Sequence, residues 1–320
     1  MTGTLEGLAA FELGDVLGEP ALAARGAQGF IWKVQTTTGA YAVKQMQPWV
    51  DAPAVPFDVA VQQAARDAGV PLPAPVLTPD GLAVVDRVRV YEWVDLASEL
   101  PRPVSVDRAS EVGDLLGRIH RLGIPPHGET GSRFLVPPSE EQWRQVLDDA
   151  RARDVTSQWI DVVETDIGYL LDVGRRFTIT PTAPAITCHG DFWPGNVLPS
   201  GDDDRLIVLD WEDAGPLTAD AELAGALVDW TSSRQGDVDL DAARALLAAY
   251  GDDATPIAES SFAMWVVTSL NFLRVLLENL VYDFEGNDPD FADAAFPLYA
   301  PDRLRAALQA IDVLVRTCER

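Results

Sequence analysis

One segment near the middle of the chain constrains the fold more than any other feature. It reads ITCHGDFWPGNVL over residues 186–198, so that apolar runs flank a polar loop with two glycines and a proline. The glycines permit sharp turns and the proline stiffens the backbone. Further along, the apolar run LIVL at 206–209 leads directly into Asp210. The pattern predicts a strand, a rigid loop and a second strand, with polar side chains at the strand ends.

The spacing of the polar residues indicates a chemistry. Asn196 follows Asp191 by five residues, and Asp210 follows Asn196 by fourteen. Such a loop is typical of phosphoryl transfer, in which the Asp receives a hydroxyl proton and the Asn holds a metal ion. Asp210 stands where a second ligand for Mg²⁺ belongs, since this ion prefers carboxylate and amide oxygens. The alternative is an ordinary loop in which these side chains cap turns, but the combined spacing favours function. His189 is interpreted as a packing and hydrogen-bonding anchor.

The rest of the chain separates into two parts. The elements expected in the first part are a hairpin of residues 29–35 and 41–46, a helix over 58–68, an extended passage over 71–75, and strands at 82–85 and 87–94. Beyond residue 95 the hydrophobic pattern is mostly helical, as at 106–122. The apolar stretch 262–280 contains polar residues that are costly in hydrocarbon, so we expect a buried helix and no membrane span. We therefore predict one domain over 1–95 and another over 96–320.

The motifs HGDFWPGNVL and VLDWEDAG resemble those of the aminoglycoside phosphotransferase and choline kinase-like family. The resemblance extends over most of the chain, from about residue 13 to the C-terminal helices. It implies an α+β fold of the bilobal protein-kinase type, with a small β-rich N-lobe that binds nucleotide and a larger, mainly helical C-lobe. It also implies that Asp191 is the catalytic base, that Asn196 and Asp210 bind Mg²⁺, and that ATP is the donor, with GTP not excluded.

Lys44 is the expected phosphate contact of the N-lobe. Only two lysines, Lys33 and Lys44, occur among the 24 basic residues. In the family a strand lysine pairs with the nucleotide phosphates and is held by an acid on the next helix. That helix offers Asp58 and neutral glutamines where a glutamate is usual, so Asp58 is the expected partner despite its short reach. A solvated strand lysine is the alternative for Lys44.

Two further nucleotide contacts follow from the resemblance. Gly26 and Gly29 lie where a hairpin turn would cover the phosphates, although a plain turn is an equal alternative. The segment 91–95 resembles the family's hinge between lobes. There Glu92 and Val94 are expected to meet the adenine through main-chain groups.

The acceptor is predicted to be a small molecule, because the sequence after Asp210 leaves no room for the activation loop of a protein kinase. Asn271, Arg274 and Glu278 form one polar stripe on the helix 262–280, and either line the acceptor site or lie at a solvent edge where Arg274 pairs with Glu278. Acids that follow this helix either receive ammonium groups of an aminosugar or aminoglycoside, or are solvated. These acids are Asp283, Glu285, Asp288 and Asp290.

The net charge of −26 disfavours anionic partners. Such a chain repels phosphate backbones and anionic membranes, so we expect no nucleic acid and no membrane partner. The acidity serves either solubility or attraction of a cationic substrate. No signal peptide is recognised and Cys188 and Cys318 show no zinc spacing, which predicts a cytoplasmic protein with reduced thiols. The oligomeric state and the choice between antibiotic resistance and metabolism stay open.

Three functions compete at this point. The first is an ATP-dependent kinase for a hydroxyl on a small, cationic or sugar-like molecule. The second is a noncatalytic nucleotide-binding protein of the same fold, which the joint presence of Asp191, Asn196, Asp210 and Lys44 disfavours. The third is a metal-dependent phosphohydrolase, which would leave Lys44 without a role and would require more ligands than the sequence suggests.

Overall fold

The computed structural model describes residues 5–26, 29–47, 55–131, 135–177, 179, 183–251, 256–282 and 289–318. The chain packs as two units. The first consists of Met1–Leu100 and His189–Ala214, and the second of Pro101–Cys188 and Gly215–Arg320. The loop over residues 189–196, called the motif loop below, thus packs with the N-terminal part of the chain. The residues that follow it are hydrogen-bonded there, since the backbone N–H of Val208 donates to the backbone oxygen of Pro71 and the backbone N–H of Ala97 donates to the backbone oxygen of Pro199. The domain boundary near residue 95 stays a prediction.

The first unit is built on a five-stranded antiparallel sheet with the strand order β1-β2-β3-β5-β4. The strands are β1 (Ala21–Gly26), β2 (Gly29–Gln35), β3 (Ala40–Met46), β4 (Pro75–Val76) and β5 (Val88–Glu92). The predicted hairpin is confirmed, since β2 pairs with β3 from Gly29↔Met46 to Gln35↔Ala40. The unit also contains the 3-10 helix η1 (Glu6–Phe11) and the helix α1 (Val55–Asp67), which begins three residues before the predicted start.

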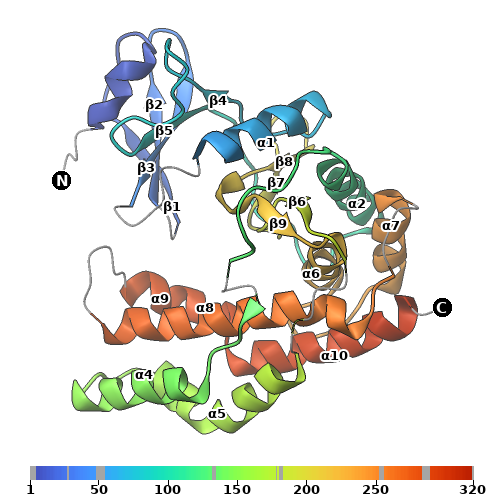
Figure 1. The fold of residues 1–320 in the computed structure, drawn as a ribbon. Coiled ribbons are helices and arrows are strands. Elements are labelled where there is room, and N and C mark those ends of the chain that lie inside the picture. The colour runs from blue at the N-terminus through green and yellow to red at the C-terminus, as the bar shows by residue number, and fades with distance from the viewer. Residues whose placement is uncertain are drawn as a thin grey trace. The chain divides into compact units, whose positions relative to one another are not determined.

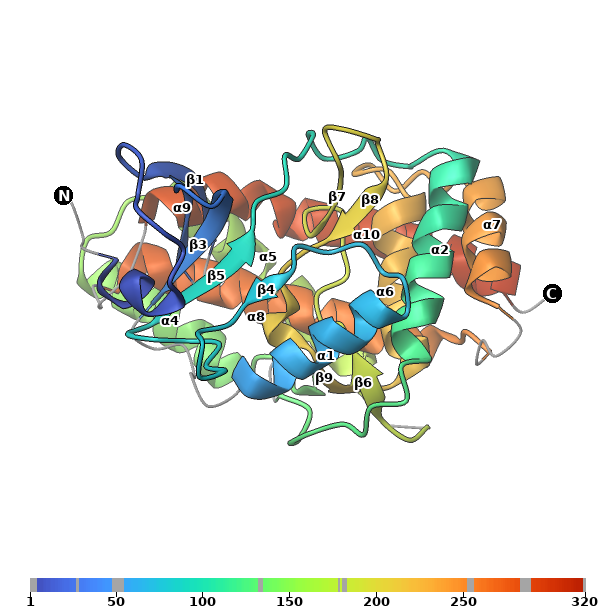
Figure 2. The same cartoon turned by 90° about the horizontal axis from the view of Figure 1, so that it is seen from above.

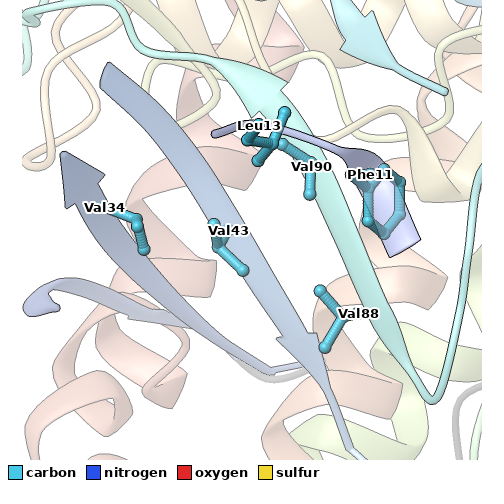
Figure 3. Packing of buried hydrophobic residues seen from close by; sticks show 6 residues of the cluster. All are labelled: Phe11, Leu13, Val34, Val43, Val88 and Val90. Atoms are coloured by element: carbon cyan, nitrogen blue, oxygen red, sulfur yellow. The ribbon is translucent and has the colours of Figure 1, made fainter. Parts of the chain in front are cut away.

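The two faces of the sheet differ in chemistry because side chains alternate along a strand. One face carries the buried valines of β2, β3 and β5, and Phe11 and Leu13 close it (Figure 3). The opposite face carries Met46, which packs against Val55 and Val59 of α1. The same face of β3 also presents Lys44, two residues before Met46, so a charged side chain lies between the sheet and the elements that cover it.

One strand was predicted in the wrong place. Residues 82–85 form no strand, and only an isolated bridge joins Val85 to Val88. The short β4 lies instead in the passage that was expected to be extended, where Pro75 and Val76 pair with Tyr91 and Val90. The extended backbone that the prolines impose is thus used for pairing.

The motif loop is framed by short elements of the first unit. Strands β7 (Val197–Pro199) and β8 (Leu206–Val208) pair as a hairpin, and the 3-10 helix η3 (Trp211–Asp213) follows. Helix η3 contacts α1. The polar face of the sheet, α1 and η3 therefore belong to one packed body.

The second unit is mainly helical, as expected, and Figures 1 and 2 show its helices. Its elements are α2 (Val106–His120), α4 (Glu140–Ala152), α5 (Gln158–Arg176), β6 (Ile186–Cys188), β9 (Gly215–Leu217), α6 (Ala219–Thr231), α7 (Leu240–Tyr250), η4 (Glu259–Phe262), α8 (Ala263–Val281), α9 (Pro289–Ala295), η5 (Phe296–Leu298) and α10 (Pro301–Cys318). Strands β6 and β9 pair antiparallel. Helix α8 contacts α4, α5, α6 and α9.

Helices α2 and α7 lie side by side in both views (Figures 1 and 2). Two glycines of α2 permit this approach. A Cβ at Gly113 would lie 2.1 Å from the carbonyl oxygen of Leu246, and one at Gly117 would lie 2.5 Å from that of Tyr250. Larger residues would therefore separate the helices.

By length and composition alone, the described residues include one helical stretch that could cross a membrane, Glu259–Val281. Half of its most apolar window is buried, including Leu270, Leu273 and Leu277 of α8.

Candidate active site

The motif loop depends on glycine at its sharpest bend. Gly190 has a φ of +86°, which L side chains rarely adopt, and a Cβ there would lie 2.1 Å from the backbone oxygen of Asp213. The bend brings the loop against the end of η3. A side chain at this position would displace Asp191, the next residue.

Asp191 and Asn196 meet across the loop. The Nδ2 atom of Asn196 donates to the Asp191 carboxylate oxygen Oδ2 over 2.5 Å and to the Asp191 backbone oxygen over 3.1 Å. The backbone N–H of Leu209 donates to the backbone oxygen of Asn196 over 2.7 Å. Because the amide nitrogen is used in this way, Oδ1 is the atom with which Asn196 could bind a cation.

His189 holds the loop in place. It is fully buried, its Nε2 lies 2.9 Å from the backbone oxygen of Leu209, and the backbone N–H of Asp191 donates to its Nδ1 over 3.2 Å. This pattern assigns the proton to Nε2. Both ring nitrogens are engaged by backbone groups, so the ring anchors the loop to the start of the Asp210 segment.

Asp210 stands between β8 and η3 with a left-handed backbone, at a φ of 57°. Its Oδ1 lies 3.1 Å from the Lys44 Nζ, and Glu212 Oε2 accepts a second hydrogen bond from the same ammonium. Burial alone would lower the pKa of Lys44, but these two carboxylates outweigh it and raise that pKa above its usual value. Lys44 is therefore a charged, buried donor.

The expected pair of Lys44 with Asp58 differs from the arrangement found. Asp58 forms a two-pronged ion pair with Arg89, at 3.0 Å and 2.7 Å, and also accepts a hydrogen bond from Gln62. The strand register sets Arg89 directly opposite Lys44, and it is Arg89 that binds the helix carboxylate. The long side chain of Arg89 reaches the short side chain of Asp58.

Glu212 and Arg89 were missed by sequence reasoning. Glu212 follows Asp210 by two residues, a spacing that could have signalled a second acid, but nothing local marked Arg89. Burial raises the pKa of Glu212 above its usual value, and the neighbouring Asp210 adds to this shift. Burial also acts to raise the pKa of Asp210, but hydrogen bonds with Glu212 and Lys44 outweigh it and hold that pKa well below its usual range.

The donor set suits a hard cation. Asp191, Asn196 and Asp210 offer carboxylate and amide oxygens within the first unit, whereas both oxygens of Glu212 already accept from Arg89 and Lys44. Such oxygens are the ligands of Mg²⁺ and Ca²⁺.

The other residues that the sequence predicts to contact the nucleotide lie at or near strand ends. Gly26 and Gly29 are paired at the tip of the β1–β2 hairpin, with residues 27 and 28 outside the described residues. A Cβ at Gly29 would lie 2.2 Å from the backbone oxygen of Gln45, so this position requires glycine. Glu92 ends β5, and its backbone N–H already donates to Ala74. Val94 follows β5 and is half-buried.

Part of the polar stripe of α8, which consists of Asn271, Arg274 and Glu278, is hydrogen-bonded within the helix itself. Arg274 pairs with Glu278 on the same helix, and the Asn271 side chain donates to the backbone oxygen of Val267 over 3.1 Å. Asp290 lies in α9, whereas Asp283, Glu285 and Asp288 lie outside the described residues.

A second cluster of polar side chains lies in the other unit. His120, Cys188 and Glu222 bring potential ligand atoms within 4.8 Å of one another, although no spacing in the sequence suggested it. The two ring nitrogens of His120 are already engaged, at 2.8 Å from the Tyr250 hydroxyl and 2.7 Å from Glu222 Oε2. Without a metal ion this cluster is a hydrogen-bonded network that joins α2, α6 and α7.

Two relatives by sequence are named homoserine kinases. The homoserine kinase of Pseudomonas aeruginosa is 29% identical over 212 residues, which cover 62% of this chain and 60% of that enzyme. The homoserine kinase of Sinorhizobium medicae is 26% identical over 289 residues, covering 88% of this chain and 84% of that enzyme.

Solved structures share the fold. A spectinomycin phosphotransferase in complex with ADP and spectinomycin superposes with a TM-score of 0.67 at 13% identity, covering 92% of both chains. An amicoumacin kinase in complex with AMP-PNP, Ca²⁺ and its substrate gives a TM-score of 0.60 at 13% identity, over 93% of this chain and 92% of that one. These likenesses confirm the predicted kinase-like α+β fold. A model of the phosphotransferase enzyme family matches residues 22–258, and the chain therefore belongs to that family.

Proposed function

We propose that this small-molecule kinase transfers the γ-phosphoryl group of ATP, with Mg²⁺, to a hydroxyl group of an acceptor that carries an amino group. The observation that carries the proposal is the contact between Asn196 and Asp191. It holds the carboxylate of a loop residue in one orientation, next to a chain segment that also supplies Asp210. Positioning of this kind is the main contribution of a protein to phosphoryl transfer.

Asp191 would accept the proton of the acceptor hydroxyl as the oxygen attacks phosphorus. Asn196 orients the accepting carboxylate through its amide nitrogen, and His189 fixes the loop backbone on the other side of Asp191. The carboxylate is half-buried, so its orientation is set by the protein. A general base of this kind contributes about 10²-fold to 10⁴-fold to the rate.

Lys44 would bind the nucleotide phosphates. Its ammonium stays charged in a buried place because Asp210 and Glu212 face it, and phosphate oxygens would replace part of that contact. The Oδ1 atom of Asn196 and the carboxylate of Asp210 would hold Mg²⁺, which neutralises charge on the phosphate oxygens when it is bound. The solved complexes of the amicoumacin kinase and the spectinomycin phosphotransferase support a nucleotide and a divalent cation.

The acceptor class is inferred from two observations. The relatives are named homoserine kinases, and the solved neighbours act on spectinomycin and amicoumacin. These acceptors share an amine together with a hydroxyl group. The net charge of −26 also favours a cationic acceptor over an anionic one.

The test is a screen for ADP release that depends on ATP, Mg²⁺ and acceptor. The panel contains homoserine, choline, ethanolamine, aminosugars and spectinomycin, and each active compound is compared with its analogue without the amine, such as 4-hydroxybutyrate for homoserine. We expect at least one amino alcohol to be turned over in preference to its analogue, and Asp191→Ala to slow this turnover by about 10²-fold to 10⁴-fold. Equal turnover by Asp191→Ala contradicts the mechanism, and equal turnover of the analogue contradicts the acceptor class.

A further inference from the structure

Two buried cations lie side by side on the same face of the sheet of the first unit. Lys44 on β3 is paired in register with Arg89 on β5, and the side chains are only 9% and 1% exposed. Like charges directly opposite each other destabilise a sheet. A buried pair of this kind persists only where carboxylates compensate it.

Three carboxylates do so, and they are divided unequally. Asp58 binds Arg89 through both oxygens. Glu212 is shared, since its Oε1 accepts from Arg89 Nη1 over 3.1 Å and its Oε2 accepts from Lys44. Of the two cations, Asp210 contacts only Lys44.

The shared carboxylate is the informative part of this network. With Oε1 held by Arg89, the carboxylate plane of Glu212 is fixed and Oε2 is directed to the lysine. Arg89 is itself fixed by the two-pronged contact with Asp58, which Gln62 steadies through a hydrogen bond of 3.1 Å. Only a planar guanidinium offers enough donors at fixed angles to bind two separate carboxylates in this way.

We propose that Arg89 is a positioning residue for Lys44, acting through Glu212. The helix carboxylate of Asp58 is then linked to the nucleotide lysine by hydrogen bonds through Arg89 and Glu212, in addition to its direct electrostatic attraction to that lysine. The proposal rests on the proposed function, because it requires Lys44 to meet nucleotide phosphates. It assigns to Glu212 the place that the sequence suggested for Asp58.

Nucleotide binding without acceptor separates this proposal from the proposed function. The affinity for a nonhydrolysable ATP analogue with Mg²⁺ is measured by calorimetry for the wild type, Arg89→Met, Arg89→Lys and the control Arg66→Met. Arg66 is an exposed cation near the end of α1, so its loss changes the charge of the same unit equally. We expect Arg89→Met to weaken binding about tenfold or more, Arg89→Lys to restore it only in part, and Arg66→Met to leave it unchanged.

The steady-state constants give a second readout. If Arg89 positions Lys44, Arg89→Met raises the KM for ATP and leaves the KM for the acceptor unchanged. A merely structural role lowers the fraction of active enzyme and moves neither KM. Unchanged ATP affinity in folded Arg89→Met overturns the proposal, whereas a wild type that binds no nucleotide overturns the proposed function.

The variant Arg89→Met leaves Asp58 buried without its partner and is at risk of unfolding. The double variant Asp58→Asn, Arg89→Met removes both charges and is used in that case, with circular dichroism to verify its fold. We expect the double variant to fold and still to bind the nucleotide weakly. Wild-type affinity in the double variant would contradict the role of Arg89.

Discussion

The two units each contain a buried polar cluster, and the clusters differ in what satisfies them. In the second unit His120, Glu222 and Tyr250 satisfy one another and join three helices. In the first unit three carboxyl groups, those of Asp58, Asp210 and Glu212, contact Lys44 and Arg89, so that acidic groups outnumber basic ones. A cluster that closes on itself stabilises helix packing. A cluster with surplus carboxylate oxygen at a loop is suited to a cation from outside.

The largest expected difference is in catalysis. Asp210→Asn removes a carboxylate from the charged cluster while keeping its shape, and we expect kcat to fall by on the order of 10²-fold to 10³-fold, because several kcal/mol of metal-ion stabilisation weaken. Activity assays at increasing Mg²⁺ concentration measure the loss. Partial recovery at high Mg²⁺ would identify Asp210 as a ligand, and undiminished kcat would argue against any catalytic role.

The next difference is in the response of stability to pH. Burial raises the pKa of Asp58 from 3.8 to about 6, against the opposing effect of Arg89. The folded protein therefore holds this proton more tightly than the unfolded chain, so the associated stability is full below about 4 and is lost as pH rises through about 6. We expect this contribution to be up to about 3 kcal/mol.

Denaturant unfolding between pH 3.5 and 7.5 measures that contribution as the difference between wild type and Asp58→Asn. The asparagine variant is expected to give the flatter curve of unfolding free energy against pH. Parallel curves would show that Asp58 titrates alike in the folded and unfolded chain.

Disruption of the second cluster should affect stability and leave catalysis intact. Glu222→Leu retains a similar volume but removes the acceptor of His120 Nε2, so a buried polar atom loses its partner. The expected cost is about 1–3 kcal/mol in unfolding free energy. Calorimetry measures the cost, and kcat at a temperature where the variant is folded should match the wild type. A loss of kcat without a loss of stability would reverse the assignment of the two clusters.

The smallest expected effect concerns the other lysine. Lys33 is 39% exposed, pairs with Asp95 at 3.4 Å and lies over the Trp93 ring at 4.3 Å. An exposed ion pair of this kind contributes little to the free energy of unfolding. We expect Lys33→Gln to change neither the melting temperature nor ATP binding measurably. Lys44→Gln differs, because it removes the cation that contacts Asp210 and leaves Glu212 with Arg89 alone. Equal losses in both variants would remove the distinction between the two lysines.

The sequence predicted what depends on local pattern. The hairpin around residues 36–39 follows from the pattern of a short stretch, and the kinase-like fold was implied by the family resemblance of two short motifs. It did not predict contacts that depend on register between distant strands. Arg89 faces Lys44 only because β5 pairs with β3 in one register, and no local signal encodes that choice.

The misplaced strand has a similar cause. Residues 82–85 have apolar character, but a strand also requires a partner, and that place beside β5 is taken by Pro75 and Val76. Glu212 was within reach of sequence reasoning, since it belongs to the same motif as Asp210. Its double contact with Lys44 and Arg89 was not.

The central claim is that phosphorus moves from ATP to a hydroxyl oxygen under the control of Asp191. ³¹P NMR of the wild type with Mg²⁺, ATP and the most active acceptor tests it directly. We predict that the γ-phosphate signal is replaced by an equal amount of a phosphomonoester signal, and that Asp191→Ala slows this conversion by about 10²-fold to 10⁴-fold. Inorganic phosphate as the sole product, or an unchanged rate in Asp191→Ala, would contradict the account.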